Sequence, residues 1–258
     1  MSRALTAALT TSAQRLWRHR PPLVARVLMY LVVLVVLAAL WRAAIGEHGA
    51  IAGYDFPAML WYLTIAEAAV ISIDPRLIEQ VGSAIGDGSV SVEMLRPVSV
   101  VGFRVASSLG ESAARFAAVL VAGSAFAWSQ VGPPPDLGAF ALAVPSALMA
   151  LTANLAAQHT FAAMAFWVND AKAAWFLYQK LVFLLGGMLL PLELLPSGVE
   201  TAARFMPFWP MSYAPGRLAS GHLDPLLLVG QAVWLVVLLG IAAYVFGVGQ
   251  RRLVVAGG

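Results

Sequence analysis

The sequence contains no cysteine, which excludes disulfide bonds and thiolate metal sites. Charged residues are also scarce, at 11% of the 258 residues; a typical soluble domain has about 25%. Hydrophobic residues make up 60% of the chain and its mean hydropathy is +0.81. The chain is therefore predicted to be an integral membrane protein. Because a spanning helix needs about 20 apolar residues, there is room for roughly six spans and short loops, but not for a second soluble domain.

Several enzyme motifs are also missing. No glycine is followed by lysine, so the phosphate-binding loop G-x-x-x-x-G-K-[ST] does not occur. The patterns H-E-x-x-H and G-x-S-x-G and paired intramembrane aspartates are absent, which argues against an intramembrane enzyme. The four histidines are scattered, so no metal site is predicted. The net charge is only +3, and membrane topology explains this weak basic bias better than binding to nucleic acid does.

Long apolar runs predict an all-α, polytopic fold with six transmembrane helices. The fourth run is uncharged and longer than one span needs, and Pro145 is a possible kink within it. The six predicted spans are roughly Leu23–Ala44, Phe56–Ile73, Val105–Trp128, a segment within Leu137–Val168, Ala173–Leu192 and Leu226–Val248.

The distribution of Lys and Arg predicts the orientation of these spans. Cytoplasmic loops of membrane proteins carry an excess of basic residues. With the N-terminus inside, eleven basic residues are cytoplasmic and three are external, so both termini are predicted to be cytoplasmic. The external ones are Arg42, Arg204 and Arg217; the cytoplasmic ones are Arg3, Arg15, Arg18, Arg20, Arg26, Arg76, Arg96, Arg104, Lys172, Arg251 and Arg252.

Residues 1–21 precede the first span and have a different pattern. Leu5, Leu9 and Leu16 fall on one face at helical spacing, and basic residues crowd the end of the segment before Pro21 and Pro22. This pattern predicts an amphipathic helix that lies at the cytoplasmic membrane interface. The alternative is a disordered basic tail.

The largest predicted cytoplasmic loop contains residues 74–98. Leu77, Ile78, Val81 and Ile85 have helical spacing, and the following sequence Gly-Asp-Gly indicates a turn. The loop is therefore predicted to hold a short amphipathic helix, a turn and a segment that returns to the membrane. The apolar face of this helix needs a cover, and the sequence leaves two open: the bilayer surface and a partner protein.

The fifth run is interrupted by Gly186 and Gly187 and is followed by a proline-rich segment. Broken backbone at membrane depth is tolerated only where protein or a water-filled cavity covers it. Residues 186–216 are therefore predicted to re-enter the membrane from the external side as a gate or pathway wall. The residues predicted to shape this gate are Gly186, Gly187, Pro191, Pro196, Pro207 and Phe208.

The second and third predicted spans contain three charged residues. Glu111 and Arg115 are four residues apart and can neutralise each other on one helix face. They form either a structural pair or part of a polar pathway lining. Glu67 has no partner in its own helix, and the two possibilities are a pair with Arg115 or a water-filled face. We expect Glu67→Gln to impair transport without loss of folded protein, and unchanged transport by the purified variant in vesicles would contradict this.

Several motifs, taken in order, resemble a known family. The loop reads IGDGSVSVEMLRPVS, and the later stretches read FWVNDAKAAWFLYQKLVFLLGGMLLPLELLP and MPFWPMSYAPGRLASG. A glycine turn before Leu-Arg-Pro, a Phe-Trp near the end of span four, a glycine-rich span five and a Pro-Phe … Tyr-x-Pro … Gly pattern are similar to ABC transporter permeases of the type-2 exporter class. The resemblance covers roughly residues 20–250.

The resemblance implies a permease subunit of an exporter in a bacterial-type cytoplasmic (inner) membrane. Cytoplasmic ATPase subunits, which bind ATP and Mg, and a second, identical or homologous permease are the implied partners; no cofactor is expected on this chain. The cargo implied by the apolar helices is lipophilic or amphiphilic, such as a drug, lipid or natural product. The alternative is an ATP-independent secondary transporter or channel. The residues assigned by the resemblance to ATPase coupling are Ile85, Gly86, Gly88, Glu93, Arg96 and Pro97.

Overall fold

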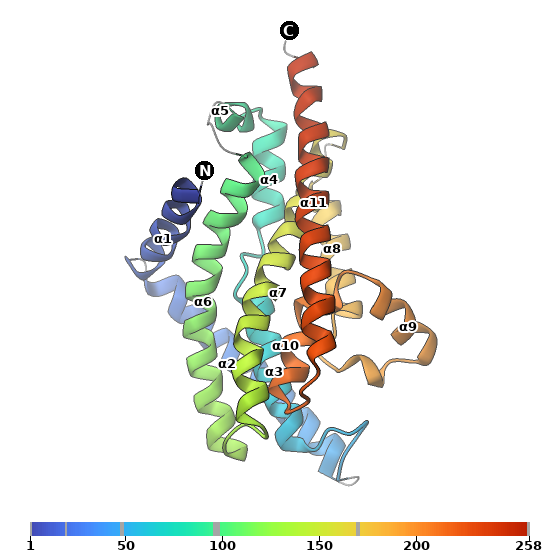
Figure 1. Ribbon diagram of the computed structural model, residues 1–258. Helices are drawn as coiled ribbons and strands as arrows, with labels where there is room; N and C mark the ends of the chain where they lie inside the picture. Colours follow the sequence, from blue (N-terminus) through green and yellow to red (C-terminus); the bar gives the residue numbers. More distant parts are fainter. Residues whose placement is uncertain (1, 19, 47–48, 95–98, 169–170, 257–258) are drawn as a thin grey trace.

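The computed structural model describes residues 2–18, 20–46, 49–94, 99–168 and 171–256, and this part of the chain is a helical bundle without named strands (Figure 1). Short 3-10 turns at Met164–Phe166, Leu192–Leu194 and Trp209–Met211 join some of the helices. The α-helices are α1 Ser2–Arg18, α2 Arg20–Gly46, α3 Phe56–Ile71, α4 Leu77–Gly86, α5 Val90–Met94, α6 Val100–Val131, α7 Leu137–Ala163, α8 Ala171–Leu185, α9 Ser197–Phe205, α10 Tyr213–Ala219 and α11 Pro225–Ala256.

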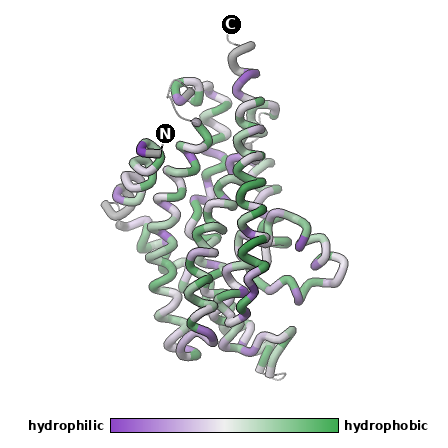
Figure 2. Tube along the Cα trace, viewed as in Figure 1, coloured by the Kyte–Doolittle hydropathy of each residue, from purple (hydrophilic) through white to green (hydrophobic). Residues whose placement is uncertain are grey.

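Four helices in the described ranges are long and apolar enough to cross a membrane: α2, α6, α7 and α11. Hydrophobic residues, in green, recur along much of α6, α7 and α11 (Figure 2). The helix α3 is apolar but has 16 residues, and α8 has 15; a straight crossing needs about 20. The six predicted spans therefore correspond to six helices, but the structure confirms the length needed for spanning in only four of them.

The hairpin between α6 and α7 shows how local sequence sets helix ends. The φ angle of Gly132 is +80°, a conformation that ends α6 without steric cost, and prolines follow it. Asp136 then caps α7, because its side chain accepts a hydrogen bond of 2.8 Å from the backbone N–H of Ala139. The helix α7 continues through Pro145 without a break.

The helix α3 forms the centre of the bundle. Its residues from Ala58 to Ala69 are all buried, and α2, α6, α7 and α10 pack around it. Asp55 caps its start by accepting a hydrogen bond of 2.8 Å from the N–H of Ala58. A helix that is apolar all round is expected at such a buried position.

The N-terminal segment is helical, as predicted, and one face of it packs against α6. A Cβ atom added to Gly110 would lie 2.1 Å from the carbonyl oxygen of Leu9, so only glycine permits this close approach of α1 and α6. The Ser12 and Ser107 hydroxyl oxygens are 2.7 Å apart, within hydrogen-bond distance. The location of α1 at the membrane interface remains a prediction.

The apolar face of α4 has a different cover from the two that were expected. Its apolar residues Leu77, Ile78, Val81 and Ile85 are buried, and α4 packs against α7 and α8. The sequence left the bilayer or a partner as the cover of this face, but the chain itself covers it. Because α7 extends past the end of α3, it offers α4 an apolar wall that the sequence pattern of α4 could not reveal.

The helix α8 ends at Leu185, seven residues before the predicted end of the fifth span at Leu192. Gly187 adopts a φ of +70°, which ends the helix. The chain then runs through α9, which projects from the side of the bundle, and returns through α10 to the bundle (Figure 1). α10 packs against α3 and α7.

Candidate transport pathway

The link between α3 and α4 is held by side chains from three other helices. Nη1 of Arg26 on α2 donates to the carbonyl oxygens of Ile71 and Ile73, at 2.5 and 2.8 Å. Nε1 of Trp175 on α8 donates to the carbonyl oxygen of Pro75 at 2.7 Å. The last carbonyls of a helix have no partner within the helix. Here these interactions satisfy them and connect the start of α4 mechanically to α2 and α8.

The third helix that reaches this link is α6. Nη1 of Arg115 lies 3.5 Å from the carbonyl oxygen of Ser72, while its Nη2 pairs with Glu111 Oε2 at 2.9 Å. The four-residue spacing predicted this pair of side chains. Glu67 does not pair with Arg115: it is buried, and its Oε1 has no hydrogen-bond partner among the described residues. Glu67 forms no ion pair with a described residue, so no such contact supports its predicted role in transport.

A cavity of about 570 Å³ lies between α2, α3, α7 and α8. Its walls include the apolar side chains of Met29, Val70, Val182, Phe183 and Met188. Sites for drug-sized ligands occupy roughly 300–1,000 Å³ and are mostly apolar with a few polar groups. The volume and the composition of this cavity fit that class.

The uncharged polar side chains of this cavity come from α7 and α8. Nε2 of Gln158 donates to Oδ1 of Asn154 at 2.9 Å, and the Tyr178 hydroxyl donates to the same oxygen at 2.5 Å. All three side chains are buried and line the cavity. The bond between Asn154 and Tyr178 joins α7 to α8. Asn154 also faces the cavity.

A second cavity, of about 220 Å³, is polar and lies between α4, α6 and α7. Arg104 on its wall forms a bidentate ion pair with Glu93, with N–O distances of 2.7 and 2.8 Å. His159 also faces this cavity; its Nδ1 bonds to the carbonyl of Leu155, and its Nε2 has no partner among the described residues. The sequence signal for this cavity is a polar stripe on α6 with steps of one, three or four residues: Arg104, Ser107, Ser108, Glu111, Ser112 and Arg115.

The break after α8 lies at one end of the larger cavity. Met188 lines that cavity directly after the two glycines. The carbonyl of Gly186 accepts hydrogen bonds from the Ser212 hydroxyl at 2.6 Å and from the N–H of Tyr213 at 3.0 Å. The carbonyl of Gly187 accepts one from the Tyr62 hydroxyl. The interrupted backbone is thus covered by α3 and by the segment around α10.

The other predicted gate residues have different environments. Phe208 is buried with its ring centroid 6.5 Å from that of Tyr178 on the cavity wall. Pro191 is also buried, Pro207 is partly exposed, and Pro196 is exposed at the start of α9. Their roles in gating remain predictions.

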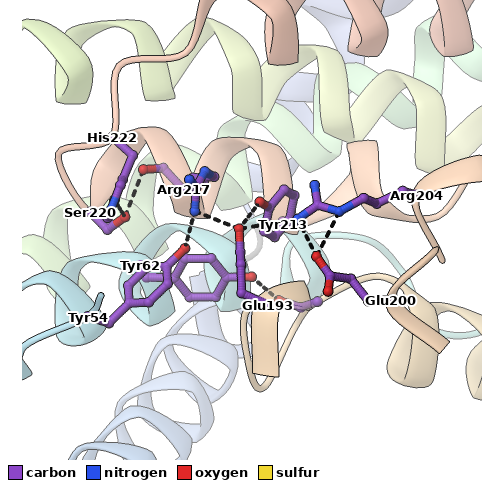
Figure 3. Close-up of polar contacts among 10 residues, drawn as sticks. Tyr54, Tyr62, Glu193, Glu200, Arg204, Tyr213, Arg217, Ser220 and His222 are labelled. Atoms are coloured by element: carbon purple, nitrogen blue, oxygen red, sulfur yellow. Dashed lines mark hydrogen bonds and ion pairs between the residues drawn. The ribbon is translucent and has the colours of Figure 1, made fainter. Parts of the chain in front are cut away.

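A charged cluster that the sequence analysis did not single out fastens this segment (Figure 3). Oε1 of Glu193 accepts a hydrogen bond from Arg217 Nη1 at 2.6 Å and another from the Tyr213 hydroxyl. Arg204 lies 3.5 Å from the same oxygen and pairs more closely with Glu200, at 2.7 Å. Glu193 Oε2 is buried without a partner among the described residues. Glu193 thus joins the short turn after α8 to α10.

The cluster extends to the loop before α3. Nη1 of Arg217 donates to the Tyr54 hydroxyl at 2.9 Å. Burial, together with the charge of Glu193, raises the pKa of Tyr54 to about 12. The ring of His222 packs 5.1 Å from that of Tyr54, and burial and Arg217 lower the pKa of His222. In the sequence, this cluster was indicated only by charged residues within an apolar segment. Their pairing could not be inferred from that pattern.

The end of α4, the turn after it and the helix α5, which carry the described coupling residues, lie at the opposite end of the bundle from α10 (Figure 1). Gly86 is exposed, and Gly88 adopts a φ of +75° in the turn before α5. Asp87 accepts a hydrogen bond of 2.9 Å from the N–H of Ser89, which lowers the pKa of Asp87. Ile85 is buried and Glu93 is paired with Arg104, so neither is a free contact residue.

Two coupling residues, Arg96 and Pro97, lie outside the described residues. The exposed part of this region is the turn around Asp87 together with Val92, whose exposed fraction is 68%. We refer to residues 86–92 as the α4–α5 tip. The assignment of the tip to ATPase coupling is tested by none of these contacts and remains a prediction.

Comparison with known proteins adds the family. None of the curated proteins matches the chain. Residues 24–257, which include most of α2 and all helices from α3 to α11, match the family described as ABC-2 family transporter protein. With several helices that can span a membrane, the chain is a multi-pass membrane permease. It belongs to the ABC-2 family of transporter proteins.

Proposed function

We propose that this chain is the transmembrane permease subunit of an ATP-driven exporter that moves a lipophilic or amphiphilic molecule out of the cytoplasm or inner leaflet. One observation carries the proposal beyond the family. The cavity of about 570 Å³ is bounded by the clamped α3–α4 link and by the glycine break after α8. A cavity of the size of a ligand site therefore lies between the element that we propose receives force from the ATPases and the element that we propose releases the cargo.

The mechanism that we propose begins at the α4–α5 tip. ATP binding closes the partner ATPases, and their movement displaces the tip. Arg26 and Trp175 transmit this displacement to α2 and α8, because both side chains bond to the α3–α4 link. Movement of α8 changes the contacts of Gly186 and Gly187 and opens the cavity towards the external side.

The partners in this proposal are cytoplasmic ATPase subunits and a second permease, and a related rather than identical second permease is favoured. ATP and Mg would be bound by the ATPases. Eleven cytoplasmic basic residues against three external ones support a cytoplasmic tip and cytoplasmic termini. The membrane proposed is a bacterial-type cytoplasmic membrane.

The absence of cysteine permits a direct test of the partner. Asp87→Cys places a single thiol on the exposed tip, and Ser129→Cys places one at the exposed opposite end of α6 as a matched control. After crosslinking in native membranes, the chain is purified in mild detergent and its adducts are identified by mass spectrometry. We expect an ATPase adduct at position 87 and none at position 129.

The same purification decides between the two functions left open by the sequence. Stoichiometric recovery of an ATPase supports the exporter, and the presence of a second permease defines the pair. Recovery of this chain alone, with no nucleotide-binding adduct at position 87, would contradict the proposal and favour an ATP-independent transporter or channel.

A further inference from the structure

The charges around the larger cavity are unequal. Lys180 on α8 and Arg26 on α2 both line it, and Asp74 is the only carboxylate among its lining residues in the described part of the chain. The Asp74 carboxylate already accepts hydrogen bonds from the N–H of Arg76 at 2.9 Å and from Gln80 Nε2 at 3.4 Å. Neither cation forms an ion pair with Asp74, and two cations against one carboxylate leave the described lining with a net positive charge.

Lys180 is the less restrained of the two cations. Its Nζ lies 5.0 Å from the centroid of the Phe176 ring, one turn earlier on α8. No ion pair between Lys180 and a described carboxylate is formed. Lys180 is exposed, so its ammonium group can pair with an anionic ligand in the cavity.

The amides add a second point of recognition. Asn154 and Gln158 are 2% and 7% exposed, and Oδ1 of Asn154 already accepts two hydrogen bonds. The Asn154 side-chain NH₂ group forms no hydrogen bond to a described residue, so it remains available as a donor to a ligand. Lys180, Arg26 and Asn154 are thus all donors, which suits an acceptor-rich, negatively charged group.

We infer that the cargo of this cavity is an anionic amphiphile: a molecule with a carboxylate, sulfate or phosphate group at Lys180 and Arg26, and an apolar body against Met29, Val182 and Phe183. The inference rests on the proposed export function and specifies its substrate class. Charge complementarity with Lys180 and Arg26 indicates an anionic head group. The volume of about 570 Å³ fits a drug-sized molecule and sets the scale of the body.

The test uses the full chain in phosphatidylcholine nanodiscs and three dansyl-labelled probes of equal chain length. The first is an undecanoate, the second its neutral methyl ester, and the third an undecyl-trimethylammonium. Binding is followed by the blue shift of dansyl emission, with empty nanodiscs subtracted. We expect the carboxylate to bind about tenfold or more tightly than the ester, because hydrogen bonds to charged groups contribute about 1.5–3 kcal/mol and a tenfold change corresponds to about 1.4 kcal/mol.

Variants at Lys180 separate recognition from folding. Lys180→Gln should reduce the preference for the carboxylate over the ester, and Lys180→Glu should reverse it in favour of the trimethylammonium probe. A merely structural lysine would not produce a reversal. Arg42→Gln removes a cation at the far end of α2 and is the control, which should retain the wild-type preference. Arg26 is unsuitable for this purpose because it also holds the α3–α4 link.

Equal binding of ester and carboxylate, tighter binding of the cation by the wild type, or an unchanged preference in Lys180→Glu would each overturn the inference. Displacement of the carboxylate by phosphatidylglycerol added to the nanodiscs would support the inference and identify a membrane lipid as a source of the anionic group. The crosslink at position 87 reports separately on the exporter. A missing ATPase adduct would contradict the proposed function while the probe preferences still measured the ligand chemistry of the cavity.

Discussion

At the scale of single residues, Glu193 determines how the segment after α8 is fastened. It lies on a turn of three residues and binds Arg217 and Tyr213, which belong to α10. The Glu193 and Arg217 side chains are 21% and 23% exposed, so solvent screens their pair only partly. Pairs of this kind contribute more to stability than fully exposed ones.

Glu193→Gln is therefore expected to lower the thermal unfolding midpoint of the purified protein. Loss of a charge-assisted hydrogen bond costs about 2 kcal/mol, which corresponds to roughly 4–8 °C for a chain of this size. Glu200→Gln is the matched control, because its partner Arg204 is 43% exposed and such pairs contribute at most about 1 kcal/mol. An equal loss in the two variants would show that Glu193 has no special role.

A pH dependence is expected at His222. Burial and Arg217 lower its pKa in the folded protein below the ordinary value of 6.5. The unfolded chain therefore binds the proton more readily than the folded one. The neutral histidine's contribution to stability is complete above about pH 6.5 and is lost as the pH falls through the folded-state pKa.

The measurement is the unfolding midpoint at pH 7.5 and pH 5.5. Wild-type protein should lose more stability between these values than His222→Gln, which cannot take up the proton. The groups that face His222 are Arg217, Glu193, Tyr54 and Ser220. Identical losses in both proteins would place the acid sensitivity elsewhere.

At the scale of elements, the end of α8 depends on Gly187. Its φ of +70° is rare for residues with a side chain. A Cβ atom at this position would lie 2.8 Å from Tyr213 Cβ and 3.0 Å from the Tyr62 hydroxyl oxygen. Backbone strain and steric contact therefore act in the same direction.

Gly187→Ala is expected to lower the free energy of unfolding by about 1–3 kcal/mol. Gly198→Ala provides the comparison, because a Cβ at Gly198 in α9 would meet nothing within 4 Å, and alanine is the better helix former by about 1 kcal/mol. Chemical denaturation in detergent measures both. An unchanged free energy of unfolding in the Gly187→Ala variant would contradict the steric explanation for the end of α8.

The α3–α4 link is the second element whose behaviour can be tested. Trp175→Phe removes the hydrogen bond to Pro75 while keeping an aromatic ring on α8. We expect amide hydrogen exchange of residues 76–80 to become about fivefold faster, since one hydrogen bond of about 1 kcal/mol is lost. Trp167→Phe, at a residue that is 45% exposed, should leave this segment unchanged. Equal exchange in all three proteins would show that Trp175 does not restrain the link.

At the scale of the whole molecule, orientation is the property to establish first. Ser83 on α4 and Ser129 near the end of α6 are exposed. The C-terminal ends of α4 and α6 lie at opposite ends of the bundle (Figure 1). In the cysteine-free chain, Ser83→Cys should react with a membrane-impermeant maleimide only in inverted vesicles. Ser129→Cys should react only in intact cells. The opposite pattern would place the α4–α5 tip outside and exclude ATPase coupling through it.

The sequence by itself determined the membrane class, the helical fold, the positions of the long helices and the interruption at Gly186 and Gly187. These properties follow from local hydropathy, from capping residues such as Asp136 and from the conformational freedom of glycine, all of which are present within a few consecutive residues. The pair Glu111–Arg115 was predicted for the same reason, because its members are one helical turn apart.

Only the tertiary structure decided which segments meet. Arg217 bonds to Tyr54 across 163 residues, and Arg26 reaches Ile73 across 47, and no local pattern encodes such pairings. The apolar face of α4 is buried because α7 and α8 pack against it. The larger cavity is formed by side chains from four helices, α2, α3, α7 and α8. Periodicity indicates that a face must be covered or a charge paired, whereas packing in three dimensions selects the partner.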